Sequence, residues 1–219
     1  MKNKTNWRAL AAAAALAIAL AGCAGQPTTY YSLAQAPSGD AAPLRSGGSS
    51  GSNNPPLYIE LAPVAVPERL ARAQMVVRKA DTPPAQVEVL EAHRWSSSFD
   101  SEMRDALAAR IARQLGAIDA SKSARPAGQA VWRIAVQVRQ FDAVQGSRVD
   151  ADVSWIVYAS EKPERHACAL HATEPVGDSL DAVAAGAQQV AAMLGDAVAQ
   201  HIAALQRNPA AGCPQPVAG

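Results

Sequence analysis

The chain has few of the residues that usually carry catalysis or bind cofactors. Only three cysteines and four histidines occur among 219 residues, and aromatic residues make up 5%. The sequence contains no His-Glu-x-x-His or Ser-x-x-Lys motif and no Gly-rich phosphate-binding loop. These absences favour a non-catalytic protein that needs no cofactor.

Neither sign of charge is in excess. The chain has 20 Lys and Arg against 19 Asp and Glu, and three of the basic residues lie before residue 9. The remainder is nearly neutral, so no basic surplus points to nucleic acid or to an anionic membrane surface.

Long apolar runs are missing except at the N-terminus. Lys2, Lys4 and Arg8 precede an apolar run over residues 9–21, which is typical of a secretory signal. The run is shorter than the roughly 18 apolar residues of a membrane span. It ends in Leu-Ala-Gly-Cys at residues 20–23, which resembles the bacterial lipobox. The alternative is an ordinary signal peptide followed by an incidental cysteine.

The lipobox implies that Cys23 becomes the acylated N-terminus of the mature protein, with palmitate-type chains. One acyl chain binds a membrane only reversibly, so the two or three chains of a bacterial lipoprotein make a lasting anchor. In Gram-negative lipoproteins an Asp after the cysteine signals retention in the inner membrane, and here that position holds Ala24. We therefore expect a lipid anchor in the outer membrane, facing the periplasm.

Two cysteines remain besides Cys23. In an oxidising compartment this predicts a disulfide between Cys168 and Cys213. The alternative is a metal site, because His166 and His171 lie close to Cys168 and residues two apart on a strand point to one side. The histidine spacing matches no standard zinc motif, so we expect no metal.

Composition divides the chain into five parts. We expect a signal peptide over 1–22, a lipidated N-terminus with a short strand over 23–34, and a folded domain over 57–208. A Gly/Ser/Pro-rich stretch over 35–56 cannot bury apolar surface and predicts a flexible loop between them. Residues 209–219 form a C-terminal tail.

The domain combines β-type and helical patterns. Short strand candidates lie at 57–61, 74–78 and 86–90, and a meander follows, with alternating strands around 132–138 and 149–157 and a third near 165–172. Apolar residues four apart predict a helix from Ser97 or Ser98 to Gly116 and another from Asp178 or Ser179 to about residue 208. The pattern predicts an α+β fold, a mostly antiparallel sheet with two helices packed on one face.

Several stretches together resemble one family. They are Tyr-Tyr-Ser-Leu at residues 30–33, the run over 59–70, His-Arg-Trp at 93–95 opening a helix, the meander, and the Ala-rich final helix. In this order they resemble the ABC-type transport auxiliary lipoproteins, the PqiC-like family. The Gly/Ser insertion and the Cys168/Cys213 pair depart from the family pattern.

The resemblance implies an outer-membrane lipoprotein that docks with a periplasmic MCE-domain protein and, through it, with an inner-membrane permease system. Such systems move phospholipid or other hydrophobic cargo between membranes and support membrane integrity. The MCE partners form rings, and the glycines at 186 and 195 of the final helix offer a packing surface, so a homo-oligomer is possible. The alternative is a lipoprotein adaptor that activates a cell-wall synthase, and an enzyme is a third, more distant possibility.

Tether length separates the first two functions. If residues 30–33 join the sheet, about five residues lie between the lipid and the fold, a reach of under roughly 20 Å. A synthase activator must cross much of the periplasm, so a short tether favours the transport subunit.

Arg94 and Trp95 form a cation-and-aromatic pair beside the expected helix start. Both residue types are enriched at docking sites, which makes the pair a candidate partner-docking site. The alternative is that Trp95 packs under the helix while Arg94 pairs with a local carboxylate.

Overall fold

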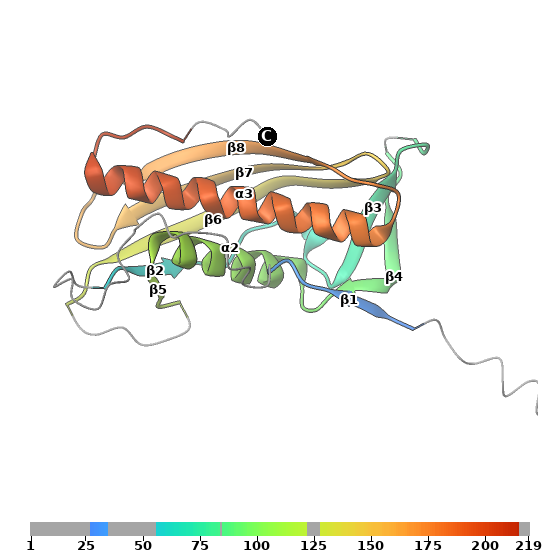
Figure 1. The fold of residues 1–219 in the computed structure, drawn as a ribbon, viewed down its shortest axis with the longest axis horizontal. Helices are drawn as coiled ribbons and strands as arrows, with labels where there is room; N and C mark the ends of the chain where they lie inside the picture. Colours follow the sequence, from blue (N-terminus) through green and yellow to red (C-terminus); the bar gives the residue numbers. More distant parts are fainter. Residues whose placement is uncertain (1–26, 35–55, 84, 122–127, 215–219) are drawn as a thin grey trace, which may run out of the picture.

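The computed structural model describes residues 27–34, 56–83, 85–121 and 128–214. Two helices lie across one face of an eight-stranded sheet (Figure 1). The strands are β1 (Thr29–Tyr31), β2 (Tyr58–Leu61), β3 (Gln74–Lys79), β4 (Glu88–Trp95), β5 (Ile118–Asp119), β6 (Val131–Gln145), β7 (Arg148–Ala159) and β8 (His166–Pro175). The helices are α2 (Phe99–Leu115) and α3 (Leu180–Arg207), and a 3₁₀ turn, η1, covers Glu68–Leu70. The predicted α+β fold is confirmed.

Strand β6 is the centre of the sheet. One edge pairs with β7 in a long antiparallel ladder, and β7 pairs in the same way with β8. The other edge accepts β2 and β3 in parallel, and β3 continues to β4 and then to β1. The long ladders are antiparallel, as predicted, but short parallel pairs add β1, β2, β3 and β5, so the sheet is mixed.

Both predicted helices form, with ends set by local chemistry. Gly116 takes a left-handed φ of 59° directly after α2, a conformation that glycine adopts without strain. At the start of α3, the Ser179 hydroxyl accepts a hydrogen bond of 3.1 Å from the Ala182 amide.

The core lies between the sheet and the two helices. Each helix buries one apolar stripe, because residues three or four apart share a face. The α2 stripe consists of Phe99, Met103, Leu107, Ile111 and Leu115, and the α3 stripe of Val183, Ala187, Val190, Leu194, Val198, Ile202 and Leu205. From the sheet, Trp155 and Ile134 face this layer.

An ion pair joins the helices at the edge of the core. The Arg110 guanidinium of α2 donates two hydrogen bonds, of 2.6 and 2.7 Å, to the Asp196 carboxylate of α3, and the Gln114 amide adds a third of 2.6 Å. This bidentate geometry fixes how the two helices cross.

The two glycines of α3 are used within the subunit. A Cβ at Gly195 would come within 2.7 Å of the Arg110 side chain on α2, and a Cβ at Gly186 would overlap Val176. Both positions are therefore close approaches inside the domain. They lend no support to an interface between copies of the chain.

Three details differ from the predicted elements. Residues 93–95 end strand β4 instead of opening a helix, because three serines at 96–98 separate β4 from α2. Strand β8 extends beyond residue 172 to Pro175, since β7 offers it a paired register as far as Arg148. Strand β5, only two residues long, is too short to give a sequence pattern.

The N-terminal strand is part of the folded domain although a long segment separates it from the next strand. β1 pairs in parallel with the end of β4, with Thr29 opposite His93 and Tyr31 opposite Trp95. The predicted signal peptide, Cys23 and almost all of the predicted loop over 35–56 lie outside the described residues. Among the described residues, no helix is both long enough and apolar enough to cross a membrane.

Candidate functional site

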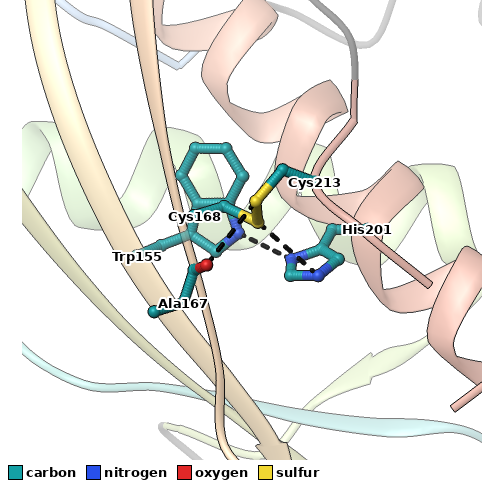
Figure 2. Close-up of a disulfide and its surroundings, with 5 residues drawn as sticks. All are labelled: Trp155, Ala167, Cys168, His201 and Cys213. Carbon is teal, nitrogen blue, oxygen red and sulfur yellow. Dashed lines mark hydrogen bonds between the residues drawn. A yellow bond between two sulfur atoms is a disulfide. The ribbon is translucent and has the colours of Figure 1, made fainter. Parts of the chain in front are cut away.

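The disulfide lies where strand β8 meets the C-terminal tail. Cys168 and Cys213 are joined, with 5.6 Å between their Cα atoms and 45 residues between them in sequence. Figure 2 shows Cys213 in the segment after α3, returned beside the strand that carries Cys168. Both sulfurs are consumed, so neither cysteine is a thiolate nucleophile or a metal ligand. Across the described ranges, no group of three or more His, Cys, Asp or Glu side chains has the arrangement of a metal site.

A buried histidine sits beneath the disulfide. The Trp155 indole N–H donates to Nδ1 of His201 at 3.0 Å, and Nε2 of His201 lies 3.6 Å from the Cys168 sulfur (Figure 2). Burial lowers the pKa of His201, and the neighbouring His166 lowers it further. The imidazole is therefore neutral at pH 7, and because Nδ1 accepts, its proton is assigned to Nε2.

A cleft opens at the C-terminal end of α3, next to this histidine. It has a volume of about 390 Å³ and is lined mainly by Trp132, Lys162, Pro163, Glu164, His166 and Leu205. We call it the α3-end cleft. Its walls are aromatic and aliphatic, and Lys162 and Glu164 add one charge of each sign from the β7–β8 turn. This composition suits an apolar side chain with polar neighbours better than a strongly charged ligand.

A second polar centre lies where the N-terminal strand meets the helices. The Glu102 carboxylate in the first turns of α2 accepts hydrogen bonds from the Ser32 hydroxyl at 3.0 Å and the Leu33 amide at 2.9 Å. It also accepts bonds from the hydroxyls of Ser96, at 2.6 Å, and Ser97, at 3.1 Å. Burial alone would raise the pKa of Glu102, but these four donors outweigh it and hold the pKa below its usual range.

Helix α3 holds the same N-terminal segment from the other side. The Gln188 amide donates to the Ser32 carbonyl at 2.6 Å, and the Tyr31 hydroxyl donates to the Asp181 carboxylate at 2.7 Å. Burial and the Asp181 carboxylate together raise the pKa of Tyr31 to about 12. Tyr31 therefore stays a hydrogen-bond donor throughout the physiological range.

The predicted docking pair does not form one surface. Trp95 is 4% exposed and packs between Tyr31 and Phe99, with ring centroids 6.5 and 5.9 Å away. Arg94 bonds the carbonyl and carboxylate of Glu91 on its own strand. The structure thus agrees with the packing alternative for Trp95, which cannot touch a partner in this conformation. Arg94 is partly exposed, and its guanidinium is paired with the Glu91 carboxylate.

On the open face of the sheet, a row of polar side chains is arranged like the acid, histidine and hydroxyl of a catalytic triad. Asp152 bonds Nδ1 of His171 at 3.0 Å, and Nε2 of His171 lies 3.1 Å from the Thr173 hydroxyl. However, the Thr173 hydroxyl donates its hydrogen bond to the Asp150 carboxylate at 2.8 Å and not to His171. The His171 side chain is 61% exposed. The α3-end cleft is lined by other side chains, and this row lies on the surface of the sheet.

Sequence reasoning missed Glu102, Gln188 and the α3-end cleft. Glu102 lies just off the apolar stripe of α2 and reads as a solvent-facing charge, and only the return of β1 buries it. The three consecutive serines before α2 were the available signal, since a cluster of short hydroxyls suits a buried carboxylate.

Comparisons with known proteins agree with this architecture. An uncharacterized protein of known structure is 20% identical, with a TM-score of 0.59, and the match covers 81% of this chain and 99% of that chain. A Xanthomonas campestris protein of family DUF330 is 12% identical, with a TM-score of 0.55, and the match covers 86% and 93%. At these identities the likeness shows the fold alone. No curated protein matches the chain.

The family comparison covers most of the sequence. Residues 40–199 match the family described as the ABC-type transport auxiliary lipoprotein component. This range holds every described strand and helix from β2 to most of α3. The chain belongs to the ABC-type transport auxiliary lipoprotein family.

Proposed function

We propose that the protein is a non-catalytic, lipid-anchored outer-membrane subunit of an envelope transport system that moves phospholipid or other hydrophobic cargo. In this proposal it docks with a periplasmic MCE-domain protein, which connects it to an inner-membrane permease. The observation that carries the proposal is the family match over residues 40–199. It supports a transport-associated lipoprotein, and the outer membrane, the MCE partner and the cargo are our extension.

The position of β1 supports a module held close to its membrane. If Cys23 is acylated, only residues 24–28 separate the lipid from Thr29, the first residue of β1. Five extended residues span under roughly 20 Å. This short tether favours the transport subunit over an activator of a cell-wall synthase.

The domain also has two distinct ends. Tyr31 contacts Asp181 near the start of α3, whereas Leu205 near the end of α3 lines the α3-end cleft. Twenty-four helical residues separate these positions, which is about 36 Å. Figure 1 shows β1 at one end of the molecule and the end of α3 at the other. An anchor at Cys23 would leave the cleft facing the periplasm, and we propose that the MCE partner inserts an apolar side chain there.

A photo-crosslinking experiment in intact cells tests this function. A photoreactive residue replaces Lys162 at the cleft, and a control copy replaces the exposed Ile156 on the open face of the sheet. We expect mass spectrometry to find an MCE-domain protein attached through position 162 and not through 156. A cell-wall synthase in its place would favour the alternative function, and no partner at either position would overturn the proposal.

We also propose that the protein forms a homo-oligomer, because its proposed MCE partner is expected to form a ring. Both glycines of α3 pack inside the subunit, so they give no support to an interface between copies of the chain through this helix. Mass measurement of the purified protein with and without the partner would decide the subunit number.

A further inference from the structure

The two sulfurs of the disulfide differ in their access to solvent. Cys168 lies on β8 and is 7% exposed, so it belongs to the buried core. Cys213 lies in the segment after α3 and is exposed. Thiol–disulfide exchange requires contact between sulfur atoms, so access decides which sulfur reacts with an outside reagent. Of the two cysteines, Cys213 is the one that meets this condition.

His201 presents an N–H group to the buried sulfur. Its Nε2 lies 3.6 Å from Sγ of Cys168, and Figure 2 shows the imidazole of α3 directed at this sulfur. The other ring nitrogen, Nδ1, accepts from the Trp155 indole at 3.0 Å. Because an indole N–H can only donate, this bond keeps the imidazole proton on Nε2. His201 is 1% exposed, which keeps bulk water away from the contact with Cys168.

This N–H group suits a thiolate better than a disulfide. A disulfide sulfur is neutral and accepts hydrogen bonds weakly, whereas a buried thiolate requires a donor. Cys168 is a thiol before the bond forms, and its thiolate is the form that reacts. The other titratable or charged side chains on this side are those of the α3-end cleft, His166, Lys162 and Glu164. Among the described residues, His201 is the histidine whose ring nitrogen contacts the Cys168 sulfur.

The chain after α3 is shaped to bring Cys213 to this place. The Asn208 side-chain oxygen accepts from the Ala210 amide at 3.1 Å, and the Asn208 carbonyl accepts from the Ala211 amide at 2.9 Å. Beyond this turn, the Cys213 sulfur lies 3.5 Å from the Ala167 carbonyl of β8. As a thiol, Cys213 can donate to that carbonyl. The tail is thus directed to β8 by hydrogen bonds as well as by the disulfide.

We propose that this disulfide exchanges in one direction only, with outside reagents reacting at Cys213 while His201 holds Cys168 as the thiolate that closes or leaves the bond. In closure, the Cys213 thiolate attacks a disulfide oxidant, which gives a mixed disulfide and releases one oxidant thiol. The Cys168 thiolate then attacks the Cys213 sulfur, and the second oxidant thiol departs. Two electrons pass from the cysteines to the oxidant, whose two thiols take up the two protons. A thiol reductant runs the same steps in reverse.

The site of attack is tested on the reduced full-length protein with glutathione disulfide as the oxidant. Cys168→Ala leaves Cys213 to react, and Cys213→Ala leaves Cys168. Mass spectrometry of separated peptides keeps any product at Cys23 apart from both. We expect Cys213 to take up glutathione at least about ten-fold faster than Cys168, because Cys168 is buried. Equal rates, or a faster reaction at Cys168, would overturn the proposed direction.

The role of His201 is tested by the thiolate fraction of Cys168 in the Cys213→Ala protein. Ultraviolet absorbance of the thiolate is measured at one mildly alkaline pH, and the spectrum of protein lacking both cysteines is subtracted. His201→Leu removes the N–H donor and should lower the thiolate fraction about ten-fold, the usual effect of one hydrogen bond to a charged group. His201→Gln keeps a donor and an acceptor, so it should recover most of the loss. An equal thiolate fraction in all three proteins would overturn the role of His201.

The rate of closure separates a lost hydrogen bond from lost stability. In His201→Leu the smaller thiolate fraction is partly offset by a stronger nucleophile, so closure of the glutathione adduct at Cys213 should be about three-fold slower. Val190→Ala is the matched control, since Val190 is buried on α3 about 16 Å along the helix from His201. It should lower stability and leave the closure rate unchanged. Equal slowing in both variants would overturn the proposal. These measurements do not depend on the crosslink at position 162 and test a property separate from the proposed transport function.

Discussion

Two buried polar side chains, Glu102 and His201, are held in opposite charge states: Glu102 is charged and His201 is neutral. Glu102 stays charged because four donors surround its carboxylate and lower its pKa. His201 stays neutral because burial lowers its pKa, and its one accepting nitrogen is satisfied by Trp155. Each residue therefore makes stability depend on pH, over a different range.

The first prediction concerns pH and His201. An unfolded histidine has a pKa near 6.5, and in the folded protein that pKa is lower. Below about pH 6.5 the unfolded chain takes up the proton more readily than the folded one, so stability should fall as pH is lowered from 7.5 to 5.5. His201→Gln, which can still accept from Trp155, should flatten this dependence in urea denaturation. An unchanged slope in the variant would contradict this assignment of His201.

The second prediction concerns the disulfide. It closes a loop of 45 residues, for which the chain-entropy account gives up to about 4 kcal/mol of stability. Cys168→Ala with Cys213→Ala should lower the free energy of unfolding toward that amount in denaturant titrations. Reduced wild-type protein should match the double variant, since both lack the same constraint. A loss below about 1 kcal/mol would mean that the tail is ordered without the bond.

At the level of whole elements, α3 depends on close contact with the strands and with α2. Gly186 lies where α3 crosses the end of β8, and a side chain there would overlap Val176. Alanine is normally about 1 kcal/mol better than glycine inside a helix. Here the contact should outweigh that preference.

The third prediction is a double-mutant cycle at this crossing. Gly186→Ala should destabilise the domain by about 1–3 kcal/mol, the usual cost of overpacking. Val176→Ala removes the overlapping methyl groups, so the double variant should be more stable than the sum of the two single changes predicts. Thermal and urea denaturation of the four proteins measure the coupling. Simple additivity would show that the helix shifts to relieve the contact.

At the level of the whole molecule, the two ends of the helix pair carry different features. The N-terminal strand joins one end and the α3-end cleft occupies the other. Under the proposed function, this arrangement would separate the anchored end of the domain from the end that meets a partner.

The fourth prediction concerns the anchor. Cys23→Ser should release a soluble periplasmic form or leave an uncleaved precursor, because acyl chains would supply nearly all of the membrane affinity. Cys213→Ser is the control, since it removes a cysteine without touching the lipobox and should leave the protein in the membrane fraction. Normal processing and unchanged fractionation of Cys23→Ser would rule out lipidation at this residue.

The elements of this fold were predictable because their signals are local. The four-residue spacing from Phe99 to Leu115 and the alternation in β6 and β7 each lie within one stretch of chain. Caps such as Ser179 and Gly116 act within a single turn. The family resemblance and the cysteine pair were also available from the sequence.

The tertiary structure alone decided what happens between distant segments. No short stretch of sequence indicates that Tyr31 lies beside Trp95 or that Trp95 is buried. The same holds for Glu102, which accepts hydrogen bonds from a segment about 70 residues away. Parallel pairing of β1 with β4 and the crossing of α3 over Val176 likewise depend on which surfaces remain to be covered once the β6–β8 meander has formed. Such contacts are chosen by the total burial and hydrogen bonding of the whole chain, and no short stretch of sequence contains that information.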